Sequence, residues 1–263
     1  MPLRASNPVV EQRRPALAVG VGVVVPCDMA LDRELWRWTP AEVSLHLTRL
    51  PLTPTVVDLE TVALMGDTAL VATTTAGLKP VAPAAVLYAC TSGSFVHGAA
   101  GERALVDAMY AAGAAAALTT SGALSTALRA LGVRRAAIAT PYDAAITSRL
   151  AAYLAELDVA VVGESHLGLS ERVWTVPYDV TAQLVRDANT AEAEAVVVSC
   201  TNLPTYDVIA ELEAELGKPV VTANQASMWA VLHAVGHPPV GDQRLLGERP
   251  DTVAAPRPAG SGR

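Results

Sequence analysis

Short apolar runs alternate with longer amphipathic stretches along most of this 263-residue chain. The runs are rich in Val and Ala, which is typical of strands buried on both faces. The longer stretches place apolar residues three or four positions apart, which is typical of helices. The runs predict strands at Ala16–Val25, Val43–Thr48, Ala84–Ala89, Ala114–Thr119, Arg135–Ala139, Val159–Val162, Ala195–Ser199 and Val220–Ala223.

Helices are predicted between these strands and after the last one. Strands that alternate with helices form parallel sheets covered on both faces, so we expect an α/β fold. The predicted helices are Pro54–Ala76, Gly101–Ala112, Ser121–Leu131, Asp143–Glu156, Asp179–Asn189, Tyr206–Leu216 and Gln225–Ala234.

Two patterns recur in the same order along the chain. The stretches Val24–Ala30 and Ala139–Ala145 both read Pro-x-Asp-x-Ala after an apolar run, and the runs Val86–Thr91 and Val196–Thr201 both end in Cys-Thr. Such matches can arise by chance in any α/β protein, but two in the same order favour an internal duplication. We therefore expect two pseudo-symmetric, Rossmann-like halves with parallel sheets and the active site between them.

The same patterns divide the chain. Residues 16–130 together with 220–246 are predicted to form the first half, and residues 131–219 the second. Residues 1–15 are expected to be a disordered leader and residues 247–263 a disordered tail rich in Pro, Gly and Arg.

Composition narrows the classes of function. Hydrophobic residues make up 51% of the chain, enough for a sizeable core, while aromatic residues reach only 4%. A net charge of −7 disfavours a nucleic-acid or anionic-membrane partner. The chain shows no signal-peptide pattern, no apolar run long enough to span a membrane, and an odd number of cysteines, three. We expect a cytoplasmic protein with reduced thiols.

Two cysteines follow equivalent predicted strands. Ligands of parallel sheets bind beyond the carboxyl ends of the strands, so Cys90 and Cys200 are expected in one cleft. Cys90 begins the hydroxyl-rich stretch Cys90–Ser94, whose donors could hold an anion and lower the thiol pKa. The alternative is that cysteine is simply a small buried hydrophobe, the interpretation we favour for Cys27.

Other polar residues near the strand ends have simpler interpretations. Asp28 and Asp143 are expected to cap helices, as aspartate commonly does. The phenol of Tyr142 could donate to a bound carboxylate or could belong to the core or surface. The histidines lack ligand spacing and Cys-x-x-Cys is absent, so the signal for a metal site is weak. Gly20-Val21-Gly22 lacks the third glycine of a dinucleotide fingerprint, so it is not taken as a dinucleotide-binding motif.

The chain resembles the aspartate/glutamate racemase superfamily. Within it, the chain is most similar to the branch of maleate cis–trans isomerases and arylmalonate decarboxylases. The resemblance covers roughly residues 16–240 and is carried by Val25-Pro26, Cys90–Phe95, Leu128–Arg135, Ala139–Tyr142 and Ser199-Cys200.

The resemblance implies a carboxylate substrate between two α/β halves, no cofactor or metal, and a homodimer. In the isomerases of this family, one cysteine adds to the double bond of maleate and the second transfers a proton. Carried onto this chain, Cys90 is the nucleophile and Cys200 the general acid and base. The implied substrate-binding residues are Pro26, Thr91, Ser92, Tyr142 and Thr201.

The same resemblance orders the possible reactions. The decarboxylases have glycine at the position of Cys90, so the presence of two thiols makes cis–trans isomerisation the favoured reaction. Racemisation of a small acid ranks second among the alternatives, and decarboxylation ranks third. A non-catalytic small-acid binder is the remaining alternative. The isomerases carry asparagines where this chain has Met29 and in the region of Leu169–Val173. The expected substrate is therefore a small acid whose second group is apolar or differently charged from that of maleate.

Overall fold

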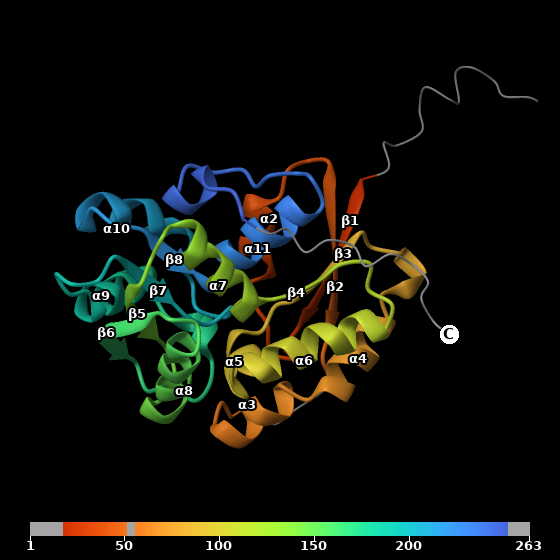
Figure 1. Cartoon of the computed structure of the whole chain (residues 1–263), viewed down its shortest axis with the longest axis horizontal. Coiled ribbons are helices and arrows are strands. Elements are labelled where there is room, and N and C mark those ends of the chain that lie inside the picture. Colours follow the sequence, from red (N-terminus) through yellow and green to blue (C-terminus); the bar gives the residue numbers. More distant parts are fainter. Residues whose placement is uncertain (1–17, 52–55, 252–263) are drawn as a thin grey trace, which may run out of the picture.

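Two four-stranded sheets form the centre of the structure, a computed structural model in which residues 18–51 and 56–251 are described. Figure 1 shows the two sheets side by side, with helices packed around them. The predicted leader, residues 1–15, lies outside the described residues, as do residues 252–263 of the predicted tail.

The first sheet has the order β2-β1-β3-β4, and all its neighbouring strands are parallel. The second sheet has the order β6-β5-β7-β8, again with all neighbours parallel. In each sheet the strands lie in the order second, first, third, fourth along the chain. This shared topology confirms the predicted α/β fold of two similar halves. The strands are β1 (Val19–Val25), β2 (Val43–Arg49), β3 (Ala85–Tyr88), β4 (Ala117–Thr119), β5 (Arg135–Thr140), β6 (Ala160–His166), β7 (Ala195–Val198) and β8 (Val220–Thr222).

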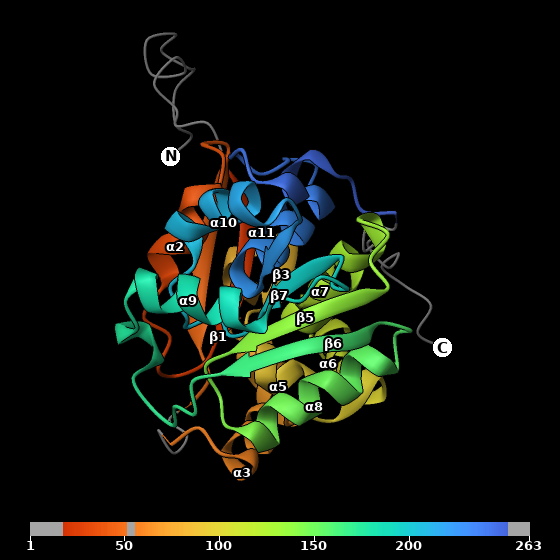
Figure 2. The same ribbon diagram turned by 90° about the vertical axis from the view of Figure 1, so that its left-hand side faces the viewer.

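Helices cover both faces of each sheet. Figure 2 shows one helix, α8, on one side of β5 and β6 and another, α9, on the other side. Four short 3₁₀ turns, η1 to η4, lie at Lys79–Val81, Val173–Thr175, Tyr206–Val208 and Arg244–Gly247. The helices are α2 (Asp32–Trp38), α3 (Leu59–Met65), α4 (Thr68–Ala76), α5 (Thr91–Phe95), α6 (Gly98–Ala111), α7 (Thr120–Ala130), α8 (Ala144–Ala155), α9 (Tyr178–Ala188), α10 (Ile209–Leu216) and α11 (Ala223–Ala234).

Several predicted elements differ from the structure. The single helix predicted over Pro54–Ala76 is two helices, α3 and α4, whose N-termini are capped by Asp58 and Asp67. Each cap satisfies a main-chain N–H at the start of its own helix, so the chain turns between them. The sequence patterns also missed α2, which is only seven residues long and has no side-chain cap.

The predicted boundary between the halves is wrong at β8. Residues 220–222 were expected in the first half, but β8 hydrogen-bonds to β7 and belongs to the second sheet. The helix that follows, α11, then packs against α7 and α2 of the first half. Residues 247–251 were expected in the disordered tail but belong to the described part of the structure. The carbonyl of Glu248 accepts a hydrogen bond from Trp229 Nε1 at 3.0 Å.

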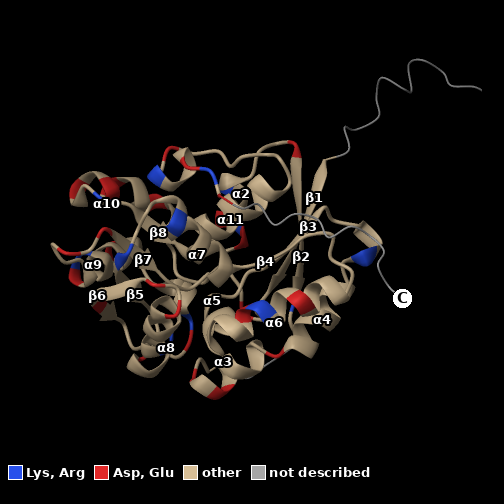
Figure 3. Cartoon of the chain, viewed as in Figure 1, with Lys and Arg blue, Asp and Glu red and all other residues tan. Residues whose placement is uncertain are grey.

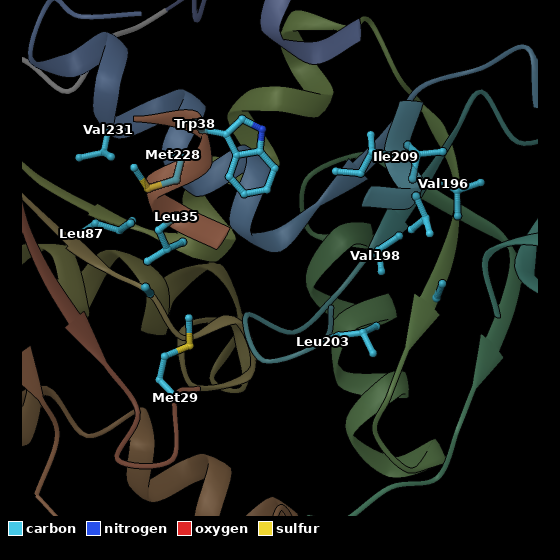
Figure 4. Close-up of a cluster of buried hydrophobic side chains, with 14 of the residues drawn as sticks. Met29, Leu35, Trp38, Leu87, Val196, Val198, Leu203, Ile209, Met228 and Val231 are labelled. Carbon is cyan, nitrogen blue, oxygen red and sulfur yellow. The ribbon is translucent and has the colours of Figure 1, made fainter. Parts of the chain in front are cut away.

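One buried apolar cluster extends through both halves. Figure 4 shows Trp38 of α2 and Met228 of α11, together with Val196 and Val198 of β7. Most charged residues lie on the outer helices and loops, with acidic residues along α10 (Figure 3), whereas Glu34 and Glu213 are buried. In the described residues, none of the helices has the length and apolar character that crossing a membrane requires.

The carboxylate of Glu34, on α2, links the halves through buried hydrogen bonds. Its side chain is only 5% exposed. It accepts from the main-chain N–H groups of Thr205 and Tyr206 at 2.8 and 3.0 Å and from Asn224 Nδ2 at 3.1 Å. The hydroxyls of Thr205 and Tyr178 lie at 3.3 and 3.4 Å. This one side chain therefore holds the loop that follows β7 against the first half.

Replacing Glu34 should destabilise the whole fold. Glu34→Ala leaves the N–H groups of Thr205 and Tyr206 buried without an acceptor, which we expect to lower the free energy of unfolding by about 3 kcal/mol. Urea unfolding followed by circular dichroism measures this change. The control is Glu215→Ala, which removes an exposed ion pair with Arg186 and should leave the unfolding midpoint nearly unchanged. Equal effects of the two substitutions would contradict the role of Glu34.

Candidate active site

A narrow cavity lies between the halves, beyond the carboxyl ends of β1, β3, β5 and β7. Its volume is about 30 Å³, room for a ligand of only a few heavy atoms unless the lining side chains move. The structure brings all seven predicted site residues to this cavity. The lining residues are Pro26, Asp28, Val57, Met65, Cys90, Thr91, Ser92, Tyr142, Val173, Cys200, Thr201 and Asn202.

Cys90 lies at the end of β3 in extended conformation and directly precedes the short helix α5. Its side chain is 3% exposed. The main-chain N–H of Gly93 and the hydroxyl of Ser92 are positioned to hydrogen-bond the Cys90 sulfur. The Tyr88 phenol also lies close, but it donates to the carbonyl of Met65 at 2.6 Å. Two donors therefore face the first thiol.

The small residues of α5 allow this turn to be fully buried. Ser94 Oγ donates to the carbonyl of Thr91 at 2.9 Å and lies 2.6 Å from Ser121 Oγ, which ties α5 to α7. A Cβ atom at Gly93 would lie 2.6 Å from the Tyr88 hydroxyl and 3.0 Å from the Cys90 sulfur. Only glycine therefore fits beside this thiol without displacing it.

Cys200 follows β7 in a different backbone conformation. Its φ angle is +92°, a region that residues with a Cβ atom rarely adopt. The main-chain N–H of Asn202 lies 3.4 Å from the Cys200 sulfur, and Thr201 Oγ1 donates to the carbonyl of Ala89 at 3.2 Å. Strained backbone of this kind persists where surrounding contacts impose it, and it is common at functional sites.

Four residues with hydroxyl groups line the cavity with the thiols: Thr91, Ser92, Tyr142 and Thr201. Thr91 Oγ1 is buried and has no hydrogen-bond partner among the described residues, which leaves it available to a ligand. The phenol of Tyr142 is 2% exposed and accepts from Ser199 Oγ at 3.4 Å. The hydroxyl of Thr201 instead donates to Ala89, so only its oxygen remains as an acceptor.

Asp28 was expected to cap a helix but lines the cavity, because α2 begins only at Asp32. Asn202 Nδ2 donates to the carbonyl of Asp28 at 3.0 Å and lies 3.4 Å from its carboxylate, and the Ala30 N–H donates to Asn202 Oδ1 at 2.9 Å. Asp143, the equivalent residue of the second half, does cap its helix, α8.

Both thiols have raised pKa values. Burial raises the pKa of Cys90, although hydrogen bonds from the Gly93 N–H and the Ser92 hydroxyl oppose the shift. Burial likewise raises the pKa of Cys200 to about 12, opposed by hydrogen bonds from Asn202 and Tyr142. The expected lowering of the Cys90 pKa is therefore wrong, because the loss of solvation outweighs the local donors.

Two residues near the site differ from their sequence-based interpretations. Cys27 was expected to be a buried hydrophobe but is only half-buried, and its carbonyl accepts from Arg49 Nη1 at 3.2 Å. Met29, where the resemblance implies an asparagine, points into the apolar core and is 2% exposed. Among the described residues, no group of three or more His, Cys, Asp or Glu is placed to hold a metal ion.

The sequence reasoning missed Asp28 and Asn202 as lining residues. The duplication contained a signal for Asn202, which follows Cys200 as Ser92 follows Cys90. No such signal existed for Asp28, since its equivalent in the second half is a helix cap. Val57, Met65 and Val173 reach the cavity from elements that no motif connects to it.

The close approach at Gly93 can be tested through stability. Gly93→Ala places a methyl group against the Tyr88 hydroxyl and the Cys90 sulfur, and overpacking of this kind costs about 1–3 kcal/mol. Urea unfolding measures the change. The matched control is Gly247→Ala, where a Cβ atom meets nothing within 4 Å. An unchanged stability for Gly93→Ala would show that the thiol is not held against this glycine.

The raised pKa values predict the pH dependence of alkylation. Only the thiolate reacts, so iodoacetamide should modify Cys90 and Cys200 slowly at neutral pH. For Cys200 the rate should keep rising toward pH 12, beyond the pH at which the thiols of the urea-unfolded chain level off. Peptide mass spectrometry after timed labelling assigns the rate to each cysteine. Native and unfolded profiles with the same midpoint would contradict the shift.

Comparisons with known proteins identify two kinds of related enzyme, arylmalonate decarboxylases and maleate isomerases. The family model described as arylmalonate decarboxylase matches residues 60–246. The arylmalonate decarboxylase of Bordetella bronchiseptica is 39% identical over 150 residues, which cover 56% of this chain and 62% of that protein, less than two thirds of its length. The maleate isomerase of Nocardia farcinica is 29% identical over 244 residues, covering 86% of this chain and 94% of that protein.

Solved structures agree with these matches. A liganded double mutant of arylmalonate decarboxylase superposes with a TM-score of 0.79 at 30% identity, covering 86% of this chain and 97% of that one. A cysteine-to-serine mutant of the Nocardia farcinica maleate cis–trans isomerase, with a covalently bound succinylcysteine intermediate, has a TM-score of 0.76 at 27% identity, with the same coverage. The chain belongs to the arylmalonate decarboxylase family, in the branch of enzymes that includes the maleate isomerases.

Proposed function

We propose that this protein is a cofactor-independent cis–trans isomerase of a small unsaturated carboxylic acid, with Cys90 as nucleophile and Cys200 as general acid and base. One observation carries the proposal: each half contributes one thiol to the same cavity. A thiol on either side of a bound alkene is the arrangement that addition and proton transfer require.

The reaction begins with one thiolate and one thiol. The Cys90 sulfur bonds to one alkene carbon, and the electron pair of the double bond takes the proton of Cys200 at the other carbon. The former double bond is now single and rotates. The Cys200 thiolate then removes a proton from the same carbon, the trans double bond forms, and the Cys90 thiolate leaves, so charge and atoms balance.

The different surroundings of the thiols support this division of roles. A pKa of about 12 keeps Cys200 protonated at neutral pH, as a general acid must be. The main-chain N–H of Gly93 and the hydroxyl of Ser92 face the Cys90 sulfur and stabilise the thiolate once it forms. Cys90, which would carry the covalent adduct, is itself 3% exposed, which limits the access of water to its sulfur.

The substrate carboxylate is assigned to the hydroxyl-lined side of the cavity. Thr91 Oγ1 has a free hydrogen-bonding capacity there, and Ser92 and Tyr142 supply further hydroxyl groups. Such groups stabilise negative charge that develops on the carboxylate during addition. Pro26 and Thr201 complete the wall of the cavity. The succinylcysteine in the related isomerase is the kind of adduct that this mechanism forms.

Decarboxylation of an aryl malonate is the second candidate, favoured by the family model and by the 39% identity to a decarboxylase. That reaction resembles the first in protonating a carbon from Cys200, but it does not need Cys90. Racemisation of a small acid would use both thiols to exchange the proton at the α-carbon. The three reactions therefore differ in their dependence on the two cysteines and in their products.

Substitution of each cysteine tests the proposal. Incubation with substituted maleates, aryl malonates and amino acids in deuterated water, followed by proton NMR, separates isomerisation, decarboxylation and α-deuteration. Cys90→Ser should abolish isomerisation, and Cys200→Ser should slow it by at least about 10²-fold, the usual contribution of a general acid.

Cys27→Ser is the matched control, because Cys27 does not line the cavity, and it should retain full activity. A decarboxylase would behave differently: Cys90→Ser would still release carbon dioxide, while Cys200→Ser would not. Full isomerase turnover by either Cys90→Ser or Cys200→Ser would reject the two-thiol mechanism.

A further inference from the structure

The cavity contains a charge that the proposed mechanism does not use. Among the described lining residues, Asp28 is the one with a charged side chain, and the others are apolar, hydroxyl, thiol or amide groups. The Asp28 carboxylate is partly buried, and its negative charge contributes to the raised pKa values of both Cys90 and Cys200. The negative charge of Asp28 therefore lies in the cavity where the substrate is expected to bind.

The positive charge nearest to Asp28 does not neutralise it within the cavity. Arg49 is exposed, and its Nη1 donates to the carbonyls of Met29 and Cys27 at 2.8 and 3.2 Å. The direct partner of the Asp28 carboxylate is the neutral amide of Asn202, at 3.4 Å. A second carboxylate bound on this side would therefore meet a like charge without a lining cation, which costs binding energy.

We infer that Asp28 selects substrates with a single carboxylate and, at the other end, an uncharged hydrogen-bond donor, of which a carboxamide is the simplest. The N–H groups of such a group would donate to Asp28, while the carboxylate takes the hydroxyl side formed by Thr91 and Tyr142. The inference rests on the proposed function for its reaction step. Its binding preference is measured separately.

A carboxamide also suits the chemistry. The hydroxyl groups of Thr91 and Tyr142 stabilise negative charge on the carboxylate, so the carbon next to the carboxylate is the one protonated, and no charge develops beside Asp28. The Cys90 sulfur bonds to the carbon that bears the carboxamide, and Cys200 protonates the carbon next to the carboxylate. After rotation, Cys200 takes back a proton from that carbon and Cys90 leaves, with no other reactant.

The test compares maleate with its monoamide, maleamate, on the full chain. We expect kcat/KM for maleamate to exceed that for maleate at least tenfold, from proton NMR of the vinyl signals. Asp28→Asn keeps an acceptor for Asn202 but removes the charge, and it should reduce this preference at least tenfold. Asp28→Ser provides a second neutral variant in case the first fails to fold.

The matched control is Asp143→Asn, which alters the equivalent aspartate of the second half. Asp143 is exposed, lies outside the cavity and caps α8, a role that asparagine also fills, so the preference should be unchanged. An Asp28→Asn preference equal to that of the unaltered protein would overturn the inference while leaving the isomerase proposal intact.

Binding is measured without turnover, as protection of Cys90 against iodoacetamide by each compound. Protection by maleamate that exceeds protection by maleate, and that Asp28→Asn abolishes, supports the inference even if neither compound is isomerised. In that case the proposed reaction fails and the ligand class stands. Equal protection by the two compounds, or no protection by either, would overturn the inference.

Discussion

The site depends on a buried carboxylate that is not part of it. Glu34 accepts hydrogen bonds from the chain just after the Cys200 loop and from the first residues of α11, so it fixes that loop against α2. Charged groups with several donors and almost no exposure hold their partners in a single arrangement, because any alternative leaves a buried charge unpaired. Glu34 therefore helps to hold the Cys200 loop, and with it the second thiol, against the first half.

A second set of contacts closes the same interface at the cavity. Asn202 forms hydrogen bonds with the main chain of Asp28 and Ala30, and Thr201 donates to the carbonyl of Ala89, next to Cys90. Asn202 and Thr201 belong to the Cys200 loop, and all three partner residues belong to the first half. The two loops that bear the thiols are consequently one hydrogen-bonded unit, with the narrow cavity between them. The raised thiol pKa values follow from this closure.

The duplication supplies two similar frames, and the site arises where they differ. Cys90 is extended and precedes a helix, whereas Cys200 has a φ of +92° and precedes a turn. Asp143 caps α8, whereas its counterpart Asp28 lines the cavity because α2 starts four residues later. A symmetric pair of halves could bind a symmetric ligand, but these differences give each thiol its own hydrogen bonds. Distinct roles for the two thiols are then chemically reasonable.

The sequence by itself determined the alternation of strands and helices, the duplication and the position of Cys90 and Cys200 at strand ends, because these depend on short-range periodicity and local turns. Its motifs also indicated the family to which the chain belongs. Tertiary structure decided the pairing of β8 with the second sheet, the place of Asp28 in the cavity and the direction of the Cys90 pKa shift. Each of these depends on contacts between distant segments, such as Asp28 and Asn202, which are 174 positions apart. Burial and long-range hydrogen bonding set them, and neither can be read from a local pattern of residues.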